Sequence, residues 1–269
     1  MEPQSNITAT VGPRIHPTAL VDPAARLADD VEIGAYSIIG PHVEIDSGTR
    51  VGPHVVIEGH TRIGKNNRIF QFSSLGAEPQ DKKYAGEPTR LEIGDDNVIR
   101  EYCSIHRGTA QDQALTRIGS RNLFMTGVHI AHDCVIGNDI IVATGSGISG
   151  HVEVGDGVIL GGMTGVHQFC KIGPYAMTAG CSLVVKDIPA YVMVGGNPAS
   201  AHGMNFEGMR RRGWTPEVIN TLRRAYKTVY REGLTLENAL LALEPETAGC
   251  PELLVFVETL KASQRGITR

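Results

Sequence analysis

An aliphatic residue recurs at every sixth position through the first two thirds of this chain. The series runs through Ile15, Val21, Leu27, Ile33, Ile39, Ile45, Val51, Ile57, Ile63, Ile69 and Leu75, and it returns at Ile93, Ile99 and Ile105. It then resumes, one position out of step, at Ile118, Phe124, Ile130, Ile136, Val142, Ile148, Val154, Leu160, Val166, Ile172, Thr178 and Val184. This period matches neither an α-helix nor a long flat strand. It is typical of short strands joined by tight corners.

Three such hexads would close one triangular coil of 18 residues, with one hexad on each side. Successive coils would stack as parallel strands about 4.8 Å apart, so each strand would pair with the one a full coil further along the chain. Stacked repeats that bury a continuous core form a solenoid. The pattern therefore predicts a parallel β-helix over residues 15–198, and it leaves the hand of that helix open.

Two segments break the period and are predicted to leave the prism as loops. The first is 76–92, where the inward positions would hold Asp81 and Glu87, which cannot face an apolar core. The second lies within 107–117, where additional residues interrupt the hexads. Counting the sides in threes places both loops on the side of the prism that carries His132. Long loops on a regular solenoid are usually functional.

Residues 199–269 follow the repeat and are predicted to form a small helical domain. Thr215 and Pro216 have the residue types of a helix N-cap and first helical position. The apolar residues that come next recur at spacings of three, four and seven, which indicates an amphipathic helix. Further helices are expected at about 235–243 and 251–263.

Composition narrows the class of protein. The net charge of −4 gives no overall reason to expect nucleic acid as a partner. No apolar run approaches the ~18 residues of a membrane helix, and residues 1–14 lack the order of a signal peptide and are predicted to be a tail. The five cysteines are odd in number, and Cys103, Cys134 and Cys170 occupy inward positions of their hexads. These features favour a cytoplasmic protein without an integral membrane segment.

The candidate chemistry lies in the segment His129-Ile130-Ala131-His132-Asp133. His132, Gly150 and Gln168 each follow an inward aliphatic residue by two positions and lie 18 residues apart, so they should stack on consecutive coils. Asp133 and His151 share the next position. His106, His129 and His167 fall at or beside the same corner. A purely structural corner needs small or turn-forming residues and has no need of imidazoles.

Acyl transfer to a hydroxyl group would suit this cluster. An alcohol needs a base that works near neutral pH, and His132 has the side chain for it. Asp133 could fix the tautomer of His132 and stabilise the imidazolium. The backbone N–H of Gly150, one coil further on, could donate to the oxyanion. No serine or cysteine occupies a nucleophile elbow, which favours direct attack without a covalent intermediate.

Two other interpretations fit the same residues less well. Histidines on neighbouring coils could hold a tetrahedral zinc ion with one open position, as in a carbonic-anhydrase-like enzyme. Against zinc, Gly150 occupies the stacking position where a further ligand would be useful. The chain could also be a structural β-helix without enzymatic activity. In that case His132→Ala would fold normally and would change no activity.

Longer motifs carry a resemblance to a known family. The segments QDKKYAGEPTR, IHRG, HIAHDC, GGMTGVHQFC and NFEGMRRRG occur in this order. From about residue 15 to the C-terminus the chain resembles the acyl-carrier-protein–UDP-N-acetylglucosamine O-acyltransferases that begin lipid A synthesis in Gram-negative bacteria. The resemblance implies a left-handed β-helix, a homotrimer with active clefts between subunits, and no metal or other cofactor. It implies transfer of a 3-hydroxyacyl group from acyl carrier protein to the 3-hydroxyl of UDP-N-acetylglucosamine.

The resemblance also implies roles for particular residues. The motif HIAHDC matches the catalytic base at His132 and its partner at Asp133, and Gly150 matches the oxyanion donor. Positions that match substrate contacts are Asp81, Lys83, His106, His129, His151, His167 and Gln168, with Asn205, Glu207 and Arg211 on the nucleotide side. Gly180 matches the position that limits acyl length. An N-acyltransferase that acts on a UDP-amino sugar is the alternative, and the segment QDKKYAGEPTR favours the O-acyltransferase.

The helical segment adds an electrostatic argument. Residues 205–231 contain seven Lys or Arg and two Asp or Glu, a local charge of +5 in a chain of net charge −4. Because acyl carrier proteins are acidic, this segment is a candidate docking surface for them. Arg211 and its neighbours would also suit the diphosphate of a UDP sugar.

Overall fold

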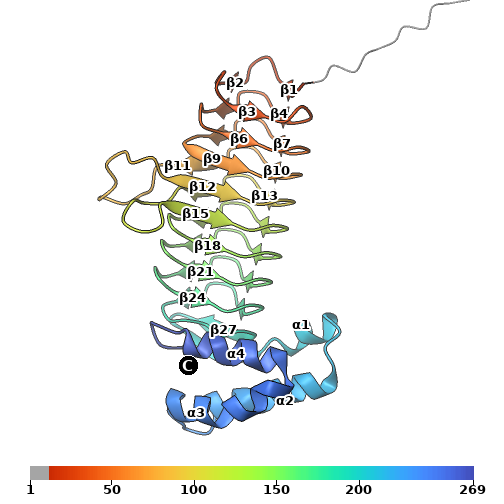
Figure 1. Cartoon of the computed structure of the whole chain (residues 1–269), viewed down its shortest axis with the longest axis vertical. Coiled ribbons are helices and arrows are strands. Elements are labelled where there is room, and N and C mark those ends of the chain that lie inside the picture. Colours follow the sequence, from red (N-terminus) through yellow and green to blue (C-terminus); the bar gives the residue numbers. More distant parts are fainter. Residues whose placement is uncertain (1–11) are drawn as a thin grey trace, which may run out of the picture.

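The computed structural model describes residues 12–269. Short parallel strands build a three-sided prism, coil upon coil, and helices cover its C-terminal end (Figure 1). The predicted tail, residues 1–14, lies outside the described residues except at its last three positions, and Arg14 already belongs to the first strand.

Each side of the prism is one sheet. The first face contains β1 (Arg14–Ile15), β4 (Glu32–Ile33), β7 (Arg50–Val51), β10 (Arg68–Ile69), β13 (Val98–Ile99), β16 (Leu123–Phe124), β19 (Ile141–Val142), β22 (Ile159–Leu160), β25 (Met177–Thr178), β27 (Val192–Gly196) and β28 (Ala199–Met204). The second face contains β2 (Leu20–Val21), β5 (Ile38–Ile39), β8 (Val56–Ile57), β11 (Ser74–Ala77), β14 (Ser104–His106), β17 (His129–Ile130), β20 (Gly147–Ile148), β23 (Gly165–Val166) and β26 (Leu183–Val184). The third face contains β3 (Arg26–Leu27), β6 (Glu44–Ile45), β9 (His60–Ile63), β12 (Arg90–Ile93), β15 (Leu115–Ile118), β18 (Val135–Ile136), β21 (Glu153–Val154) and β24 (Lys171–Ile172).

The strand register confirms the repeat read from the sequence. Ile15 pairs with Ile33 and Ile130 pairs with Ile148, one coil of 18 residues apart. The inward aliphatic residues are buried from Ile33 onward and form one continuous core along the prism. Cys103, Cys134 and Cys170 are buried in that core, as predicted. One inward side chain from each hexad is enough to fill the narrow interior.

The three corners of the prism differ in the side chains that they carry. The aromatic corner, between the first and second faces, carries Tyr36, His54, Phe72 and Tyr102. The histidine corner, between the second and third faces, carries His132, Asp133, Gly150 and His151. The asparagine corner, between the third and first faces, carries Asn67, Asn97 and Asn122, whose side chains bond to the next coil. The polar candidates for chemistry are therefore concentrated on one edge.

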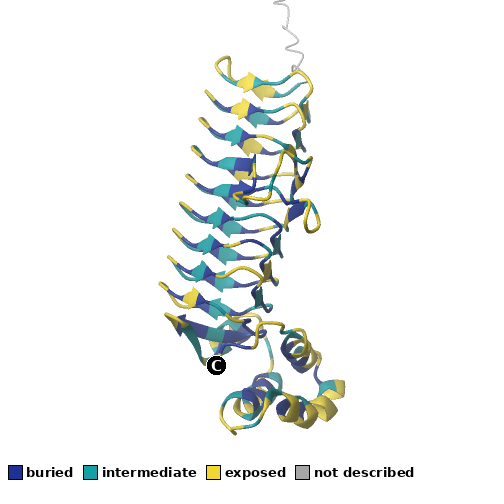
Figure 2. Cartoon of the chain, turned by 90° about the vertical axis from the view of Figure 1, so that its left-hand side faces the viewer, coloured by how far each residue is buried: buried dark blue, intermediate teal, exposed yellow. Residues whose placement is uncertain are grey.

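Both predicted loops leave the prism at the histidine corner, and both are shorter than predicted. Strands β11 and β12 extend to Ala77 and from Arg90, which confines the first loop to 78–89. Strand β15 begins at Leu115, so the second loop is 107–114. The predicted bounds were too wide because the hexad count assumes short strands, whereas β11, β12 and β15 are four residues long. Figures 1 and 2 show the loops projecting from an otherwise regular stack.

The C-terminal segment begins as a strand, which corrects the prediction that residues 199–269 are helical throughout. Strand β28 turns back and pairs antiparallel with β27 on the last coil. The helices then follow as α1 (Phe206–Arg211), α2 (Pro216–Tyr230), α3 (Leu236–Leu243), the 3₁₀ helix η1 (Glu244–Gly249) and α4 (Pro251–Lys261). Thr215 caps α2 and Pro216 opens it, as predicted. Within residues 12–269, no helix is long and apolar enough to cross a membrane.

Candidate functional site

His132 and Asp133 form a hydrogen-bonded pair although they are neighbours in sequence. Asp133 has a φ of 59°, which turns its side chain back beside the imidazole. His132 Nδ1 lies 2.9 Å from Asp133 Oδ2. Because an ionised carboxylate can only accept, Nδ1 carries the proton and Nε2 presents its lone pair. The His132 side chain is 13% exposed, so it can contact a ligand, whereas the Asp133 side chain is fully buried and shielded from water.

Asp133 is held by the second loop as well as by His132. The backbone N–H of Thr109 donates to its Oδ1 over 2.9 Å, and the Thr109 hydroxyl donates to its Oδ2 over 2.6 Å. Its own N–H donates to Thr116 Oγ1. Burial alone would raise the pKa of Asp133, but the hydrogen bonds from His132 and Thr109 outweigh it and hold the pKa below its usual value. Asp133 is therefore an anion at neutral pH.

Gly150 lies against the face of His132, as the stacking of coils predicted. A Cβ atom at Gly150 would come within 2.6 Å of His132 Cε1 and 2.8 Å of Nε2, so only glycine leaves room for the imidazole. Among the described residues, no acceptor bonds its N–H. Other hexads place proline at this position, as at Pro41, Pro53 and Pro174, which shows that the fold makes no use of an N–H here. Within the described part of the chain, the Gly150 N–H is therefore left free to bind a ligand.

His151 forms a second histidine–aspartate pair next to the first. Its Nδ1 lies 2.6 Å from Asp112 Oδ2, a residue of the second loop. Its ring stacks on Phe169 with 4.5 Å between centroids and meets the His132 ring edge to face at 5.0 Å. The sequence placed His151 at this corner, but nothing in the sequence pattern indicated Asp112 as its partner.

His106 and His129 lie on the coils that precede His151. Their rings meet edge to face at 5.0 Å, and Ser104 Oγ lies 2.8 Å from Nδ1 of His129. Burial, with His129, His132 and Arg107 nearby, lowers the pKa of His106 to about 4, and burial next to His132 lowers that of His129. Both are neutral near pH 7. Nδ1 of His106 is buried without a hydrogen-bond partner in the described part of the chain.

His167 and Gln168 lie one coil beyond Gly150. Nδ1 of His167 contacts the carbonyl of Gln168 at 3.1 Å, and both residues are exposed. These two residues thus extend the polar edge along the corner by one coil. It places neither side chain in hydrogen-bond contact with His132.

The first loop contributes its predicted residues from outside the prism. Asp81 accepts a hydrogen bond from the N–H of Lys83 and shapes the loop, and the Lys83 side chain is exposed. Arg107, which the sequence analysis missed, anchors this loop by donating to the Gly76 carbonyl over 2.7 Å and to the Tyr84 hydroxyl over 2.7 Å. Its position directly after His106 in the IHRG segment was the only signal available.

The predicted nucleotide-side residues are not part of the histidine corner of the same chain. Asn205 caps α1 by accepting from the Gly208 N–H, and Glu207 pairs with Arg211. Helix α1 lies on the opposite side of the prism from the two loops (Figure 1). Gly180 is exposed at the corner between the first and second faces. One chain by itself does not gather the complete predicted set.

The donor set does not suit the zinc alternative. One ligand atom each from His132, Asp133 and His151 lies within 4.8 Å of the others. However, His132 Nδ1, the Thr109 N–H and the Thr109 hydroxyl already occupy the Asp133 carboxylate, and Asp112 occupies His151 Nδ1. Among the described residues the two Nε2 atoms are unused, but a metal bound through the Asp133 carboxylate would compete with those hydrogen bonds, whereas a base at His132 Nε2 requires no rearrangement.

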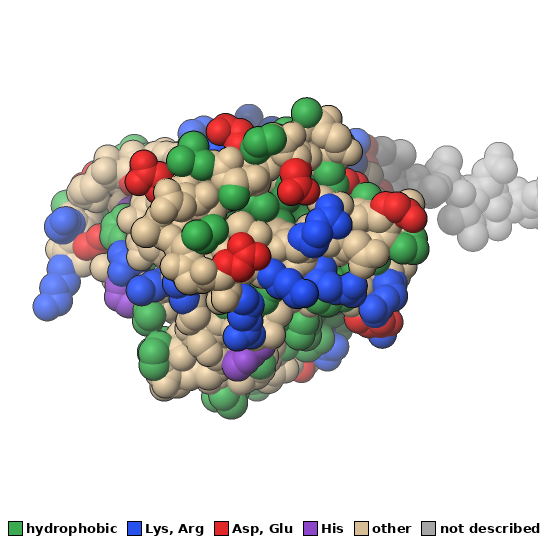
Figure 3. Space-filling view, turned by 90° about the horizontal axis from the view of Figure 1, so that it is seen from below, with side chains coloured by type: hydrophobic (Ala, Val, Ile, Leu, Met, Phe, Trp, Pro, Cys, Tyr) green, Lys and Arg blue, Asp and Glu red, His purple; other side chains and the backbone are tan. Residues whose placement is uncertain are grey.

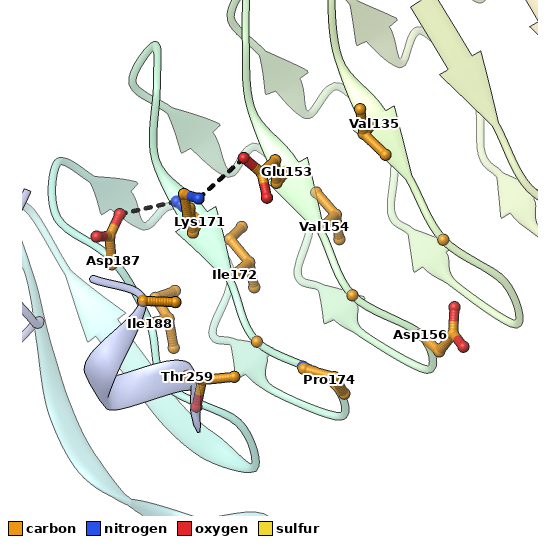
Figure 4. A pocket seen from close by; sticks show the side chains of 14 residues that line it. Val135, Glu153, Val154, Asp156, Lys171, Ile172, Pro174, Asp187, Ile188 and Thr259 are labelled. Atoms are coloured by element: carbon orange, nitrogen blue, oxygen red, sulfur yellow. Dashed lines mark hydrogen bonds and ion pairs between the residues drawn. The ribbon is translucent and has the colours of Figure 1, made fainter. Parts of the chain in front are cut away.

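A separate groove lies between the third face and α4 (Figure 4). It is lined by aliphatic side chains together with Lys171, which pairs with Glu153 over 3.0 Å. The backbone N–H of Lys171 donates to Asp187. None of the predicted site residues lines this groove, so it is distinct from the histidine corner.

The prism and its histidine corner are those of a parallel β-helix acyltransferase, and comparison with known proteins identifies the family. The family model described as UDP N-acetylglucosamine O-acyltransferase, domain 2, matches residues 187–268. A relative from Thiobacillus denitrificans, named acyl-[acyl-carrier-protein]–UDP-N-acetylglucosamine O-acyltransferase, is 61% identical and covers 95% of this chain and 99% of its own length. The chain belongs to this family of O-acyltransferases.

Solved structures agree with this assignment. The structure of LpxA from Acinetobacter baumannii superimposes with a TM-score of 0.93 at 55% identity and covers 95% of this chain and 99% of its own. UDP-N-acetylglucosamine O-acyltransferase (LpxA) from Moraxella catarrhalis gives a TM-score of 0.93 at 50% identity with the same coverage. The predicted fold, a left-handed parallel β-helix with a helical C-terminal segment, is confirmed.

Proposed function

We propose that this chain transfers a 3-hydroxyacyl group from acyl carrier protein to the 3-hydroxyl of UDP-N-acetylglucosamine, the first step of lipid A biosynthesis. The names of its relatives give the two substrates. The single observation that carries the mechanism is the arrangement at the histidine corner. There a buried carboxylate holds Nδ1 of His132, and the ring with its Nε2 packs against Gly150, whose N–H has no acceptor among the described residues.

In the proposed reaction, His132 Nε2 removes the proton of the sugar hydroxyl as its oxygen attacks the thioester carbonyl. Asp133 stabilises the imidazolium that forms. The Gly150 N–H donates to the oxyanion of the tetrahedral intermediate, an interaction typically worth ~3 kcal/mol. When the intermediate collapses, the carbon–sulfur bond breaks and His132 returns the proton to the leaving thiolate. The sugar ester and free carrier thiol are the products, and no cofactor takes part.

The active form in this proposal is a homotrimer, as the family resemblance implies, and the charges on the faces of the prism support an interface between subunits. The outward residues of the second face are Leu20, Ile38, Val56, Ser74, Ser104, His129, Gly147, Gly165 and Leu183, with no Asp, Glu, Lys or Arg among them. Those of the third face alternate in charge and form ion pairs such as Arg26–Glu44 and Lys171–Glu153. An uncharged face that ends at the site is suited to pack against a neighbouring subunit.

A trimer would also complete the set of substrate contacts. Helix α1, which is capped by Asn205 and carries Glu207 and Arg211, lies on the opposite side of the prism from the two loops in one chain (Figure 1), so in this proposal these residues reach the cleft from another copy. The remaining proposed contacts are Asp81, Lys83, His106, His129, His151, His167 and Gln168, with Gly180 as the candidate limit on acyl length. A cytoplasmic location would give this enzyme access to both soluble substrates.

The basic surface of the helical end is the proposed docking site for acyl carrier protein. Seen from below, Lys and Arg side chains gather across this end of the molecule (Figure 3). Arg223, Arg224 and Lys227 project from α2 and Arg210 and Arg211 from α1. An acidic carrier would be attracted to this surface and oriented by it.

Acyl transfer can be measured with purified protein, UDP-N-acetylglucosamine and 3-hydroxyacyl carrier proteins of several chain lengths. We expect transfer by the wild type and a loss of about 10²–10⁴ in kcat for His132→Ala, because the base is removed. His16→Ala is the matched control, since His16 is exposed and, among the described residues, its ring hydrogen-bonds only to Thr18. Wild-type activity in His132→Ala would refute the proposed base, and absence of transfer with every carrier would refute the proposed reaction.

A further inference from the structure

The second loop returns to the histidine corner and contacts both imidazole–carboxylate pairs. It leaves the prism after β14, and its residues Thr109 and Asp112 reach the coils of β17 and β20. Thr109 is only 1% exposed, although it belongs to a loop. Burying a polar loop residue is costly unless its donors and acceptors are satisfied, and here both donors of Thr109 point at Asp133. The loop is thus built into the site.

The hydrogen bonds of Thr109 determine the orientation of the Asp133 carboxylate. Its N–H donates to Oδ1 over 2.9 Å and also lies 3.1 Å from Oδ2, while its hydroxyl donates to Oδ2 over 2.6 Å. Oδ2 is the atom that receives the His132 Nδ1–H. The terminal torsion of an aspartate is broad, so the carboxylate needs donors on both oxygens to remain in one orientation. Thr109 supplies them.

We propose that Thr109 is a positioning residue for the acyl transfer, acting on the base through Asp133. The chain of contacts runs from the Thr109 hydroxyl to Asp133 Oδ2 and from there to His132 Nδ1. This inference rests on the proposed function, since it assigns Thr109 a role only if His132 is the base. Thr109 does not touch the reacting atoms. Its effect is to keep the Asp133 carboxylate ionised and oriented toward His132 Nδ1.

Asp112 extends the same role of the loop to the neighbouring imidazole. Its carboxylate accepts from His151 Nδ1 over 2.6 Å, and His151 meets His132 edge to face. Asp133 Oδ2 is 4.0 Å from the same His151 nitrogen, so the two pairs share one electrostatic environment. One short loop therefore fixes the directions of two adjacent imidazoles that come from different coils.

Two substitutions separate the hydroxyl of Thr109 from its volume. Thr109→Val keeps the shape and removes the O–H, and we expect kcat to fall about tenfold or more with KM for both substrates unchanged, because a hydrogen bond to a charged group is lost. Thr109→Ser restores the hydroxyl and should restore kcat. Thr49→Val is the matched control, since the buried Thr49 hydroxyl donates to the Gly64 carbonyl away from the site.

Each outcome decides between the two proposals. If the wild type is active, His132→Ala is inactive and Thr109→Val keeps the wild-type kcat, the inference is wrong while the proposed function stands. If Thr109→Val and Thr49→Val lose activity equally and in step with their melting temperatures, Thr109 is merely structural and the inference is again wrong. Should Thr109→Val fail to fold, Thr109→Ala, which adds no bulk, is compared with Thr109→Ser. If the wild type transfers no acyl group, the proposed function itself fails.

Discussion

The aromatic corner and the histidine corner use the same backbone for different purposes. In both, the third residue after the inward aliphatic adopts a left-handed conformation, with φ of 61° at Phe72 and 62° at His151. At the aromatic corner this column is Tyr36, His54, Phe72 and Tyr102, whose rings stack 5.1–5.3 Å apart. Around the site, the same column at the histidine corner is Asp133, His151 and Phe169, and of these three only His151 and Phe169 stack.

The difference between the corners comes from what leaves the prism at each. The aromatic corner has short turns throughout its described length, and its rings stack on one another. The histidine corner releases both loops, and the second brings Thr109 and Asp112 against the column. A backbone geometry that stacks rings at the aromatic corner therefore holds charged and hydrogen-bonded groups at the histidine corner. The repeat places residues in equivalent positions at each corner, and the loop contacts determine which of these residues are held in a catalytic arrangement.

The largest difference between the two corners is expected in kcat, when the glycine at the equivalent position of each corner is replaced by alanine. Gly150→Ala puts a methyl group within 2.6 Å of the His132 ring, so the base must move, and we expect kcat to fall about 100-fold. Gly162→Ala is the control at the aromatic corner, where the nearest atom would be 3.4 Å away, and it should retain activity. Acyl transfer assays on both variants test this comparison, and equal activities would contradict it.

A smaller effect is expected on stability, from the burial of the histidine corner. The pKa of His106 is lowered from 6.5 to about 4, so between these values the unfolded chain binds more protons than the folded one. The stabilising contribution is complete above pH 6.5 and is lost as the pH falls toward 4, by at most about 3 kcal/mol. Urea unfolding across this range should show a shallower pH dependence for His106→Gln than for the wild type. An unchanged slope in His106→Gln would contradict the prediction.

The smallest effect is expected from single exposed side chains. Tyr102→Ala removes one ring from the aromatic column and should cost about 1 kcal/mol, because stacked aromatic pairs contribute roughly that much. If the aromatic corner lies inside a trimer, the variant should also dissociate at higher protein concentration in sedimentation velocity. Arg26→Ala, which removes an exposed ion pair on the third face, should change stability by less than about 0.5 kcal/mol. Equal effects of the two substitutions would argue against an interface at the aromatic corner.

Much of this protein follows from its sequence because the hexad period fixes which residues stack. The strand register, the core cysteines, the corner shared by both loops and the contact of Gly150 with His132 were all predicted from spacing. What spacing could not give was the path of residues outside the period. Arg107, Thr109 and Asp112 lie in or beside such a segment, and no count of hexads indicates that they reach Tyr84, Asp133 and His151.

The sequence by itself thus determined the prism, its core and the edge on which the histidines gather, because a strict period leaves one register for each residue. The tertiary structure decided which of those histidines are held, and by what. In the folded chain, the N–H and the hydroxyl of Thr109 donate to Asp133, and the carboxylate of Asp112 accepts from His151. The Gly150 N–H has no acceptor among the described residues. These contacts join segments that the repeat does not relate, so only the folding of the loops onto the corner brings them together.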